Sequence, residues 1–256
     1  MKFKEFINKI LFYVSVPKCV GCKTRLSVND SALCPECMKE YNNIKLRNCS
    51  ICSKPLCECS CSNEYLKAHY VKKLIKVFRY VHREPLPSNN LIYSLKRDNR
   101  RDVLDFLTKE LCDSINNSID NPKELIFTNV PRRKESIRKY GIDHAELLAK
   151  SVAKCFSATY YQPLYSNSRY EQKHMSSIDR IKNADFKIKK NAKDLKGKTV
   201  VLVDDIVTTG ASMGACAMLL RALKTKKTVG AVIAVAYKDD YIPFDKEDRY
   251  LPYKKT

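Results

Sequence analysis

The sequence predicts an α/β protein in which helices flank a parallel sheet, preceded by a small zinc-ribbon-like module. From about residue 68, near-continuous apolar segments alternate with amphipathic ones, as parallel strands alternate with the helices that cover them. Before that point, nine of the twelve cysteines lie between Cys19 and Cys61. We therefore expect an N-terminal helix and a single or double zinc module over residues 1–66, an α/β domain over 67–240 and a C-terminal tail over 241–256.

The composition indicates a soluble globular protein. Of its 256 residues, 44% are hydrophobic and 30% charged, which is not typical of a disordered chain. Apolar runs all fall short of the roughly 18–20 residues that cross a bilayer, so no transmembrane segment is expected. Glu5 and Lys9 interrupt the first apolar stretch, and no small-residue cleavage site follows it. This start predicts a short amphipathic helix rather than a signal peptide, and a cytoplasmic location.

Two Cys-x-x-Cys pairs, separated by eleven residues, predict a first zinc site. Each pair is expected to form a knuckle that presents two thiolates on one side of a tight turn, and two knuckles complete a tetrahedral site. Gly21 and Pro35 suit such turns. In a reducing cytoplasm this clustering favours metal over disulfides. The four ligands would be Cys19, Cys22, Cys34 and Cys37.

A second zinc site is predicted by Cys49 and Cys52 with two further cysteines from CECSC. We assign Cys59 and Cys61, but no pair among the three cysteines has the x-x spacing, so Cys57 stays an alternative. Cross-brace pairing between the two sites is also compatible with the spacing. Four cysteine ligands leave no open coordination position, which favours a structural role. Zinc would stabilise a module that has few apolar residues of its own.

The positive charge belongs to the larger domain. The formal net charge is +20, yet residues 1–66 carry only ten basic and six acidic side chains. Because each zinc tetrathiolate is worth about −2, two zinc sites would bring the module near neutrality. The remaining residues carry 38 basic and 22 acidic side chains. A polyanionic partner is one explanation, and a lysine-rich background is the other.

The elements of the larger domain follow from apolar spacing. Short runs dominated by apolar residues predict buried strands at 69–81 (one or two strands), 124–130, 199–203 and 226–237. Apolar residues three or four apart predict helices at 101–115, 144–156 and 212–223. We expect Ser212 to cap the last helix.

Asp204 and Asp205 follow the apolar run Val200–Val203, at the sheet edge where α/β proteins bind ligands. The loop beyond them leads into a helix, whose N-terminal N–H groups and dipole favour an anion. The loop supplies hydroxyl donors and a glycine that lets the backbone close around a phosphate, namely Thr208, Thr209, Gly210 and Ser212. Two carboxylates beside a phosphate cradle suit a sugar phosphate, because they can accept hydrogen bonds from vicinal ribose hydroxyls.

Val200–Ser212 (VVLVDDIVTTGAS) resembles the phosphoribosyl pyrophosphate (PRPP) motif of type I phosphoribosyltransferases. The resemblance implies that fold, with Asp204 and Asp205 facing the ribose 2′- and 3′-hydroxyls. It implies Mg²⁺ bridging pyrophosphate and ribose oxygens, and a 5′-phosphate held by Val207, Thr208, Thr209, Gly210, Ala211 and Ser212. The strand ending at Val130 should then lead into a pyrophosphate loop (PRRKES) that includes Pro131, Arg132 and Arg133. A solvated basic face is the alternative for that run.

Landmarks along nearly the whole chain are similar to the ComF family of phosphoribosyltransferase-like competence proteins. They are the cysteine pairs, YSLKRDNRRD, NVPRRKESIRKYGIDHAELLA and EQKHMSSIDRIKNADF. Of the family's R-G-F-N-Q segment, residues 140–144 keep only the glycine. The resemblance implies a role in natural transformation, with PRPP and single-stranded DNA as ligands and DNA-uptake proteins at the inner membrane as partners.

The segment Arg169–Asn183 is a candidate flexible cover for the site, through Arg169, Gln172, Arg180 and Asn183. An exposed basic loop explains it equally well. Phosphoribosyl transfer passes through an oxocarbenium-like transition state, so positioning the sugar and stabilising the leaving pyrophosphate suffice. The sequence therefore identifies no catalytic residue, and it contains no recognisable element for reading an acceptor base.

Basic residues interleaved with tyrosines favour binding to single-stranded nucleic acid. One span combines Tyr80 and Tyr93 with Arg79, Arg83, Lys96, Arg97, Arg100 and Arg101, and residues 169–198 contain ten basic and four acidic side chains. No groove-reading motif is present, so binding should be independent of sequence and sensitive to salt. Our main hypothesis is a PRPP-binding competence protein that helps internalise single-stranded DNA. The alternatives are an active phosphoribosyltransferase with an unidentified acceptor and a PRPP-sensing regulator.

Overall fold

The computed structural model describes residues 17–27, 30–82, 84–167 and 185–236. The N-terminal helix predicted at the start of the chain, the tail over 241–256 and the candidate cover residues Arg169, Gln172, Arg180 and Asn183 lie outside these ranges.

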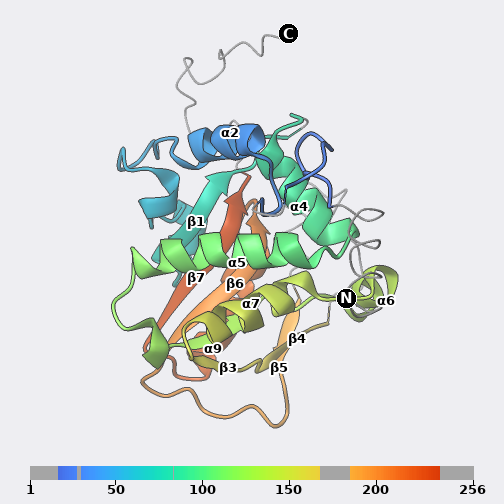
Figure 1. The fold of residues 1–256 in the computed structure, drawn as a ribbon. Helices are drawn as coiled ribbons and strands as arrows, with labels where there is room; N and C mark the ends of the chain where they lie inside the picture. The colour runs from blue at the N-terminus through green and yellow to red at the C-terminus, as the bar shows by residue number, and fades with distance from the viewer. Residues whose placement is uncertain (1–16, 28–29, 83, 168–184, 237–256) are drawn as a thin grey trace.

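Five parallel strands form the central sheet, in the order β1-β7-β6-β2-β3. Their bounds are Lys73–Arg79 (β1), Ile126–Asn129 (β2), Thr159–Tyr160 (β3), Thr199–Val207 (β6) and Lys227–Val235 (β7). The middle strands β6 and β7 are nearly continuous runs of buried residues, as expected when helices cover both faces. The prediction of a parallel α/β sheet is confirmed (Figure 1).

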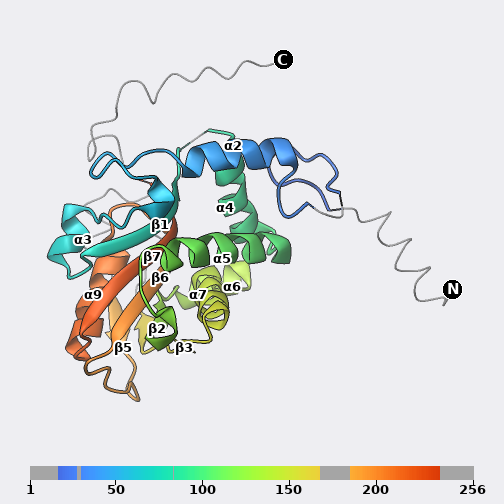
Figure 2. The ribbon, with the colours of Figure 1, turned by 60° about the vertical axis from the view of Figure 1, so that its left-hand side comes forward.

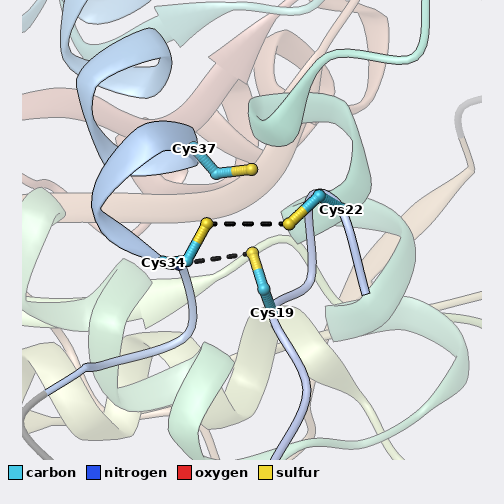
Figure 3. Close-up of side chains that lie close together, drawn as sticks. All are labelled: Cys19, Cys22, Cys34 and Cys37. Carbon is cyan, nitrogen blue, oxygen red and sulfur yellow. Dashed lines mark hydrogen bonds between the residues drawn. The ribbon is translucent and has the colours of Figure 1, made fainter. Parts of the chain in front are cut away.

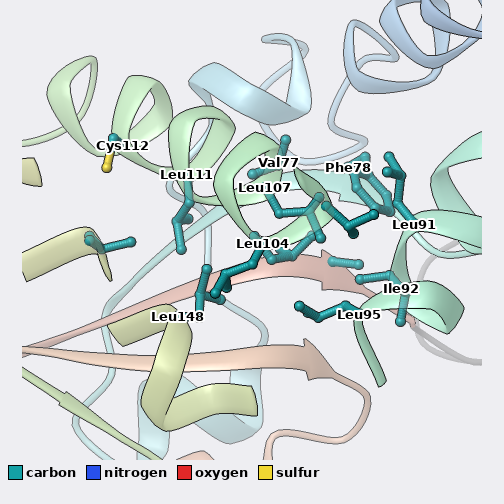
Figure 4. Close-up of a cluster of buried hydrophobic side chains, with 14 of the residues drawn as sticks. Val77, Phe78, Leu91, Ile92, Leu95, Leu104, Leu107, Leu111, Cys112 and Leu148 are labelled. Atoms are coloured by element: carbon teal, nitrogen blue, oxygen red, sulfur yellow. The ribbon is translucent and has the colours of Figure 1, made fainter. Parts of the chain in front are cut away.

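Helices cover the two faces of the sheet unequally. Helices α5 (Arg101–Asn116) and α7 (His144–Cys155) lie on one face, and α9 (Ala211–Ala222) lies on the other (Figure 2). The short helix α3 (Glu64–Ala68) packs against α9. On α5, apolar residues at helical spacing form the buried stripe that the sequence predicts, and Leu104, Leu107 and Leu111 belong to one buried cluster with Val77 and Phe78 of β1 (Figure 4).

The cysteine module shares its core with the sheet. Helix α2 (Pro35–Lys45) and the 3-10 turn η1 (Leu56–Glu58) both pack on β1. The hydroxyl of Tyr41 donates a 2.9 Å hydrogen bond to Glu110 of α5, and Lys45 lies 2.7 Å from the same carboxylate. The predicted boundary at residue 66 falls inside α3. Buried residues of the module and of the sheet therefore belong to one cluster.

Several elements were not predicted from the sequence. Outside the cysteine module they are α4 (Pro87–Arg97), α6 (Lys134–Tyr140), β3, the 3-10 turn η2 (Pro122–Glu124) and an antiparallel pair formed by β4 (Leu164–Ser166) and β5 (Phe186–Ile188), and within it α2, η1 and α3. The PRRKES segment, expected to be a loop, becomes helical at Lys134. Each of these elements is short or lacks a long apolar stripe, so spacing alone gives little signal.

Two local predictions around the acidic pair were wrong. Strand β6 does not end at Val203 but continues to Val207, because β7 runs beside it over its full length. Ser212 does not cap α9. The N-cap is Gly210, whose φ of 88° lies in the left-handed region that glycine adopts without strain, and Ser212 stands in the first turn.

Candidate functional site

A cavity of about 740 Å³ opens at the carboxyl edge of the sheet. Its size is within the range of ligand pockets, roughly 300–1,000 Å³. Segments far apart in sequence line it: the end of β1, helix α4, the loop after β2, the β4–β5 pair and the loop between β6 and α9. The predicted residues among its lining are Pro131, Arg132, Arg133, Asp204, Val207, Thr208, Thr209, Gly210, Ala211 and Ser212.

The loop before α9 gives the cavity an anion-binding end. Its backbone turns at Gly210 and points the N-terminus of α9 at the cavity, where N–H groups and the helix dipole favour a phosphate. The hydroxyl of Thr209 accepts a 3.2 Å hydrogen bond from the Ala211 amide. The side chain of Asn63, the N-cap of α3, donates to the Thr209 carbonyl at 3.3 Å. The cysteine-rich end of the chain thus helps to fix this loop.

The two aspartates occupy different environments. Asp204 is half-buried and lines the cavity. Asp205 is 5% exposed and does not line it, because its carboxylate lies 2.5 Å from Arg132 and 3.1 Å from Lys96. The pair therefore does not present two equivalent carboxylates to a ligand in this state of the protein.

These environments shift the pKa values of the two carboxyl groups in opposite directions. Burial, with the negative charge of Asp205 added to it, raises the pKa of Asp204 to about 8. Burial also opposes ionisation of Asp205, but Lys96 and Arg132 outweigh it and lower the pKa of Asp205 to about 2. At neutral pH the pair therefore carries one negative charge, which resides on Asp205.

Arg132 links this acidic pair to α7. Its backbone amide donates a 3.0 Å hydrogen bond to Asp143, which also accepts from the Glu146 amide and so caps α7. The neighbouring His144 is 1% exposed and its Nε2 lies 2.7 Å from the side-chain oxygen of Asn99. Burial, Arg132 and Lys96 lower the pKa of His144 to about 4, so it is neutral at pH 7. Asp143 and His144 therefore have structural roles beside the site.

Sequence reasoning missed the wall of the cavity that α4 provides. Tyr93, Lys96 and Arg97 line this wall with Tyr80 and His82, which follow β1. Tyr80, Tyr93, Lys96 and Arg97 were singled out for nucleic-acid binding, but not as neighbours of the phosphate loop. A Pro at the helix start with apolar residues at 91, 92 and 95 was the available signal.

The first cysteine cluster gathers Cys19, Cys22, Cys34 and Cys37, with all four sulfurs within 4.8 Å of one another (Figure 3). Only its first half is a knuckle. Cys34 and Cys37 instead belong to the start of α2, because Pro35 occupies the first turn and begins a helix. Gly21 is required for space, since a Cβ there would lie 2.6 Å from the Cys37 sulfur.

The second cluster gathers Cys49, Cys52, Cys59 and Cys61 under the same distance limit. Cys57 is not among them. The first cluster draws only on residues 19–37 and the second only on residues 49–61, so the cross-braced alternative does not occur. Four thiols at this mutual distance are the donor set that Zn²⁺ prefers in closed structural sites, and both clusters fit the ion.

Zinc content should distinguish the cysteines of the CECSC segment. We expect the purified protein to hold about two zinc ions per chain, since each cluster supplies four thiolates. Cys59→Ser should lower the content by about one, whereas Cys57→Ser should leave it unchanged. Metal analysis of protein prepared without chelators measures both. Loss of zinc in Cys57→Ser with retention in Cys59→Ser would contradict the assignment.

Residues 139–253 match the phosphoribosyl transferase domain family. This part of the chain is phosphoribosyltransferase-like. The match includes the loop between β6 and α9 that forms the anion-binding end of the cavity. No curated protein matches the chain in sequence. Among the helices that the structure describes, none is long and apolar enough to cross a membrane.

Solved phosphoribosyltransferases are similar to the chain at low identity. A hypoxanthine phosphoribosyltransferase from Staphylococcus aureus shares 15% identity at a TM-score of 0.35, and the match covers 54% of this chain and 65% of that one. The match thus spans less than two thirds of that protein. An adenine phosphoribosyltransferase from Rhodothermus marinus shares 12% identity at a TM-score of 0.34, covering 54% and 80%. The adenine phosphoribosyltransferase of Saccharomyces cerevisiae shares 16% identity at a TM-score of 0.34, and the match covers 62% of this chain and 76% of that one.

Proposed function

We propose that this protein binds PRPP with Mg²⁺ in the cavity, binds single-stranded DNA beside it, and assists DNA internalisation during natural transformation. One observation carries the proposal: a single cavity joins the helix N-terminus of α9, the acidic pair and the basic loop after β2. The competence role draws on the similarity of the sequence landmarks to the ComF family. It would place the protein in the cytoplasm, with DNA-uptake proteins at the inner membrane as its partners.

The chemistry of the lining supports PRPP as the ligand. The N-terminus of α9 and the hydroxyls of its loop suit the 5′-phosphate, and Asp204 suits a ribose hydroxyl. Arg132 and Arg133, which line the same cavity, suit the pyrophosphate. Mg²⁺, when bound together with PRPP, would neutralise part of the pyrophosphate charge.

Ligand binding should rearrange the acidic pair. Asp205 is held by Lys96 and Arg132, so it can face ribose only if those two cations turn to other anions. The phosphates of PRPP are such anions. In our proposal Lys96 and Arg132 exchange Asp205 for the pyrophosphate, and positive charge brought close to Asp204 would lower its pKa.

Single-stranded DNA has a supporting platform at the cavity mouth. Tyr93 is 51% exposed, and the guanidinium of Arg97 lies 5.4 Å from its ring centroid. Such a tyrosine–arginine pair can stack a base and attract its phosphate. The excess of basic side chains in the larger domain adds sequence-independent attraction to the backbone.

The cavity also favours one alternative, an active phosphoribosyltransferase with an unidentified acceptor. Tyr80, Ile92 and Tyr93 also line the cavity, and such aromatic and apolar side chains suit a planar acceptor. Pyrophosphate release from PRPP in the presence of an acceptor would establish this activity. A PRPP-sensing regulator would instead show ligand-dependent partner binding without turnover.

Calorimetry with PRPP and Mg²⁺ tests the ligand. We expect a micromolar Kd for the wild type and at least a 100-fold loss in Asp204→Asn/Asp205→Asn, because the ribose contacts and the local charge balance both disappear. Asp194→Asn is the matched control, since Asp194 is a surface acid paired with Lys224. A folded, zinc-loaded wild type that does not bind PRPP would overturn the proposal.

The affinity for single-stranded DNA is measured by fluorescence anisotropy of a labelled single strand at several salt concentrations. Tyr93→Ala should weaken binding about 5- to 100-fold, the usual cost of one lost stacking contact. Tyr70→Ala is the control, because Tyr70 also stacks with an arginine, Arg221, at 3.7 Å. Equal losses in both variants, or affinity that does not change with salt, would contradict this interface.

A further inference from the structure

Lys76 is a buried lysine in the middle of β1. It is 2% exposed and stands between Ile75 and Val77, which are fully buried. Lysine is almost never fully buried unless its charge is paired. The side chain therefore needs an explanation that the apolar strand around it does not give.

The ammonium group of Lys76 points at the second cysteine cluster. Its Nζ donates to the Cys61 carbonyl at 2.7 Å and lies 3.2 Å from the Cys59 sulfur. The carbonyls of Leu74 and Cys59 are its other acceptors, at 3.3 and 3.5 Å. The Cys59 sulfur, 1% exposed, also accepts a hydrogen bond from the Cys61 amide at 3.3 Å.

These contacts leave the charge of Lys76 without a carboxylate partner. Every acceptor that the described part of the chain places within hydrogen-bond distance of its Nζ is a carbonyl oxygen or a cysteine sulfur. Carbonyl dipoles satisfy the donors but bring no negative charge. A set of four neutral thiols would leave an uncompensated cation in the interior, which is strongly unfavourable.

A metal-bound cluster supplies the missing negative charge. Zinc binds cysteine as thiolate, so a site with four thiolates carries a net charge of about −2. We propose that Lys76 is the internal counter-cation of the second zinc site, donating a charge-assisted hydrogen bond to the Cys59 thiolate. Zinc loading and the burial of Lys76 then stabilise each other, and the cluster is joined electrostatically to the edge strand of the sheet.

This inference concerns Cys49, Cys52, Cys59 and Cys61 alone and does not depend on PRPP or DNA. Groups that hydrogen-bond to metal ligands change metal affinity by about 10- to 100-fold when they are removed. Removing Lys76 should therefore weaken the second site by that factor and leave the first site, at Cys19 to Cys37, as it was.

The test is zinc release from the full-length protein to an excess of a chromogenic chelator. Wild type should release two ions in two phases, and Cys59→Ser identifies the phase of the second site by its loss. Lys76→Met should speed that phase about 10- to 100-fold and leave the other phase unchanged. Lys72→Met is the matched control, because Lys72 is exposed and lies just before the same strand. Unchanged or slower release in Lys76→Met would overturn the proposal.

A second comparison tests the proposal even if Lys76→Met alone folds poorly. In Cys49→Ala, which cannot complete the second site, Lys76 should be an unpaired buried cation. Adding Lys76→Met should then raise the thermal midpoint or the yield of soluble, one-zinc protein. A double variant that is no more stable than Cys49→Ala would show that Lys76 does not respond to the metal.

Discussion

Asp204→Asn should stabilise the ligand-free protein by about 1–2 kcal/mol at pH 8, whereas Asp205→Asn should destabilise it by about 2–4 kcal/mol. The two residues are adjacent and chemically identical, so the opposite signs arise from their surroundings alone. Asp204 is half-buried beside a negative charge, and Asp205 is buried between two positive ones.

The stabilisation gained by Asp204→Asn should depend on pH. Burial raises its pKa from 3.8 to about 8, so the folded state retains a proton that the unfolded state releases. The stability that this proton contributes is complete below about pH 4 and is lost as pH rises to about 8. Asparagine does not titrate, so the advantage of Asp204→Asn should grow between pH 5 and pH 8 and level off above that.

Titration of Asp205 itself should add no pH dependence to the loss in the same window. Lys96 and Arg132 lower its pKa to about 2, so its contribution is present above pH 4 and is lost only as pH falls through 2. Asparagine would remove the carboxylate that Lys96 and Arg132 share, and breaking a buried ion pair is costly.

Urea unfolding at pH 6, 7 and 8, with zinc present throughout, measures both effects. Asp194→Asn serves again as the surface control, with an expected change below about 0.5 kcal/mol. Destabilisation by Asp204→Asn at pH 8, or stabilisation by Asp205→Asn, would contradict the charge distribution described for the pair.

The second large effect is expected at Gly210. Gly210→Ala should destabilise the protein by about 2–4 kcal/mol and disrupt the phosphate loop. The residue has a φ of 88°, and an added Cβ would lie 2.7 Å from Leu66 Cγ. Backbone strain and overpacking therefore add at one position.

Gly197→Ala separates these two contributions. Gly197 also has a positive φ, 74°, but an added Cβ would meet nothing within 4 Å. Backbone strain alone should lower the free energy of unfolding of its alanine variant, by about 1 kcal/mol. Urea unfolding of the two variants gives the difference. Equal losses would mean that Leu66 yields to the new methyl group without cost.

The sequence was sufficient for elements that have a strong local pattern. The stripe on α5, the apolar strands β6 and β7 and the first cysteine cluster each repeat a signal over several residues, and all were predicted. The Asp204 position on the cavity wall followed from the rule that strands of α/β sheets end at ligand sites.

The partners of the site residues could not be predicted in the same way. Lys96, Arg132 and Asp205 meet although they are far apart in the chain, and no local pattern encodes that meeting. The sequence places Lys76 in a predicted strand but does not predict its burial. That burial depends on the cysteine cluster that residues 49–61 form around its side chain. Helix α4 was missed because its apolar stripe covers few turns.

The position of β1 has a consequence for biosynthesis. Lys73 of β1 pairs with Val229 of β7, roughly 150 positions later, so the first strand made must wait for the last. At translation rates of about 5–20 residues per second this wait lasts roughly 8–30 s, during which an apolar edge lacks its neighbour and is open to aggregation. Both cysteine clusters are already complete when that wait begins. A nascent chain that captures zinc early can therefore shield its first strand on the ribosome, and zinc starvation should reduce the yield of newly made protein more than the stability of protein already folded.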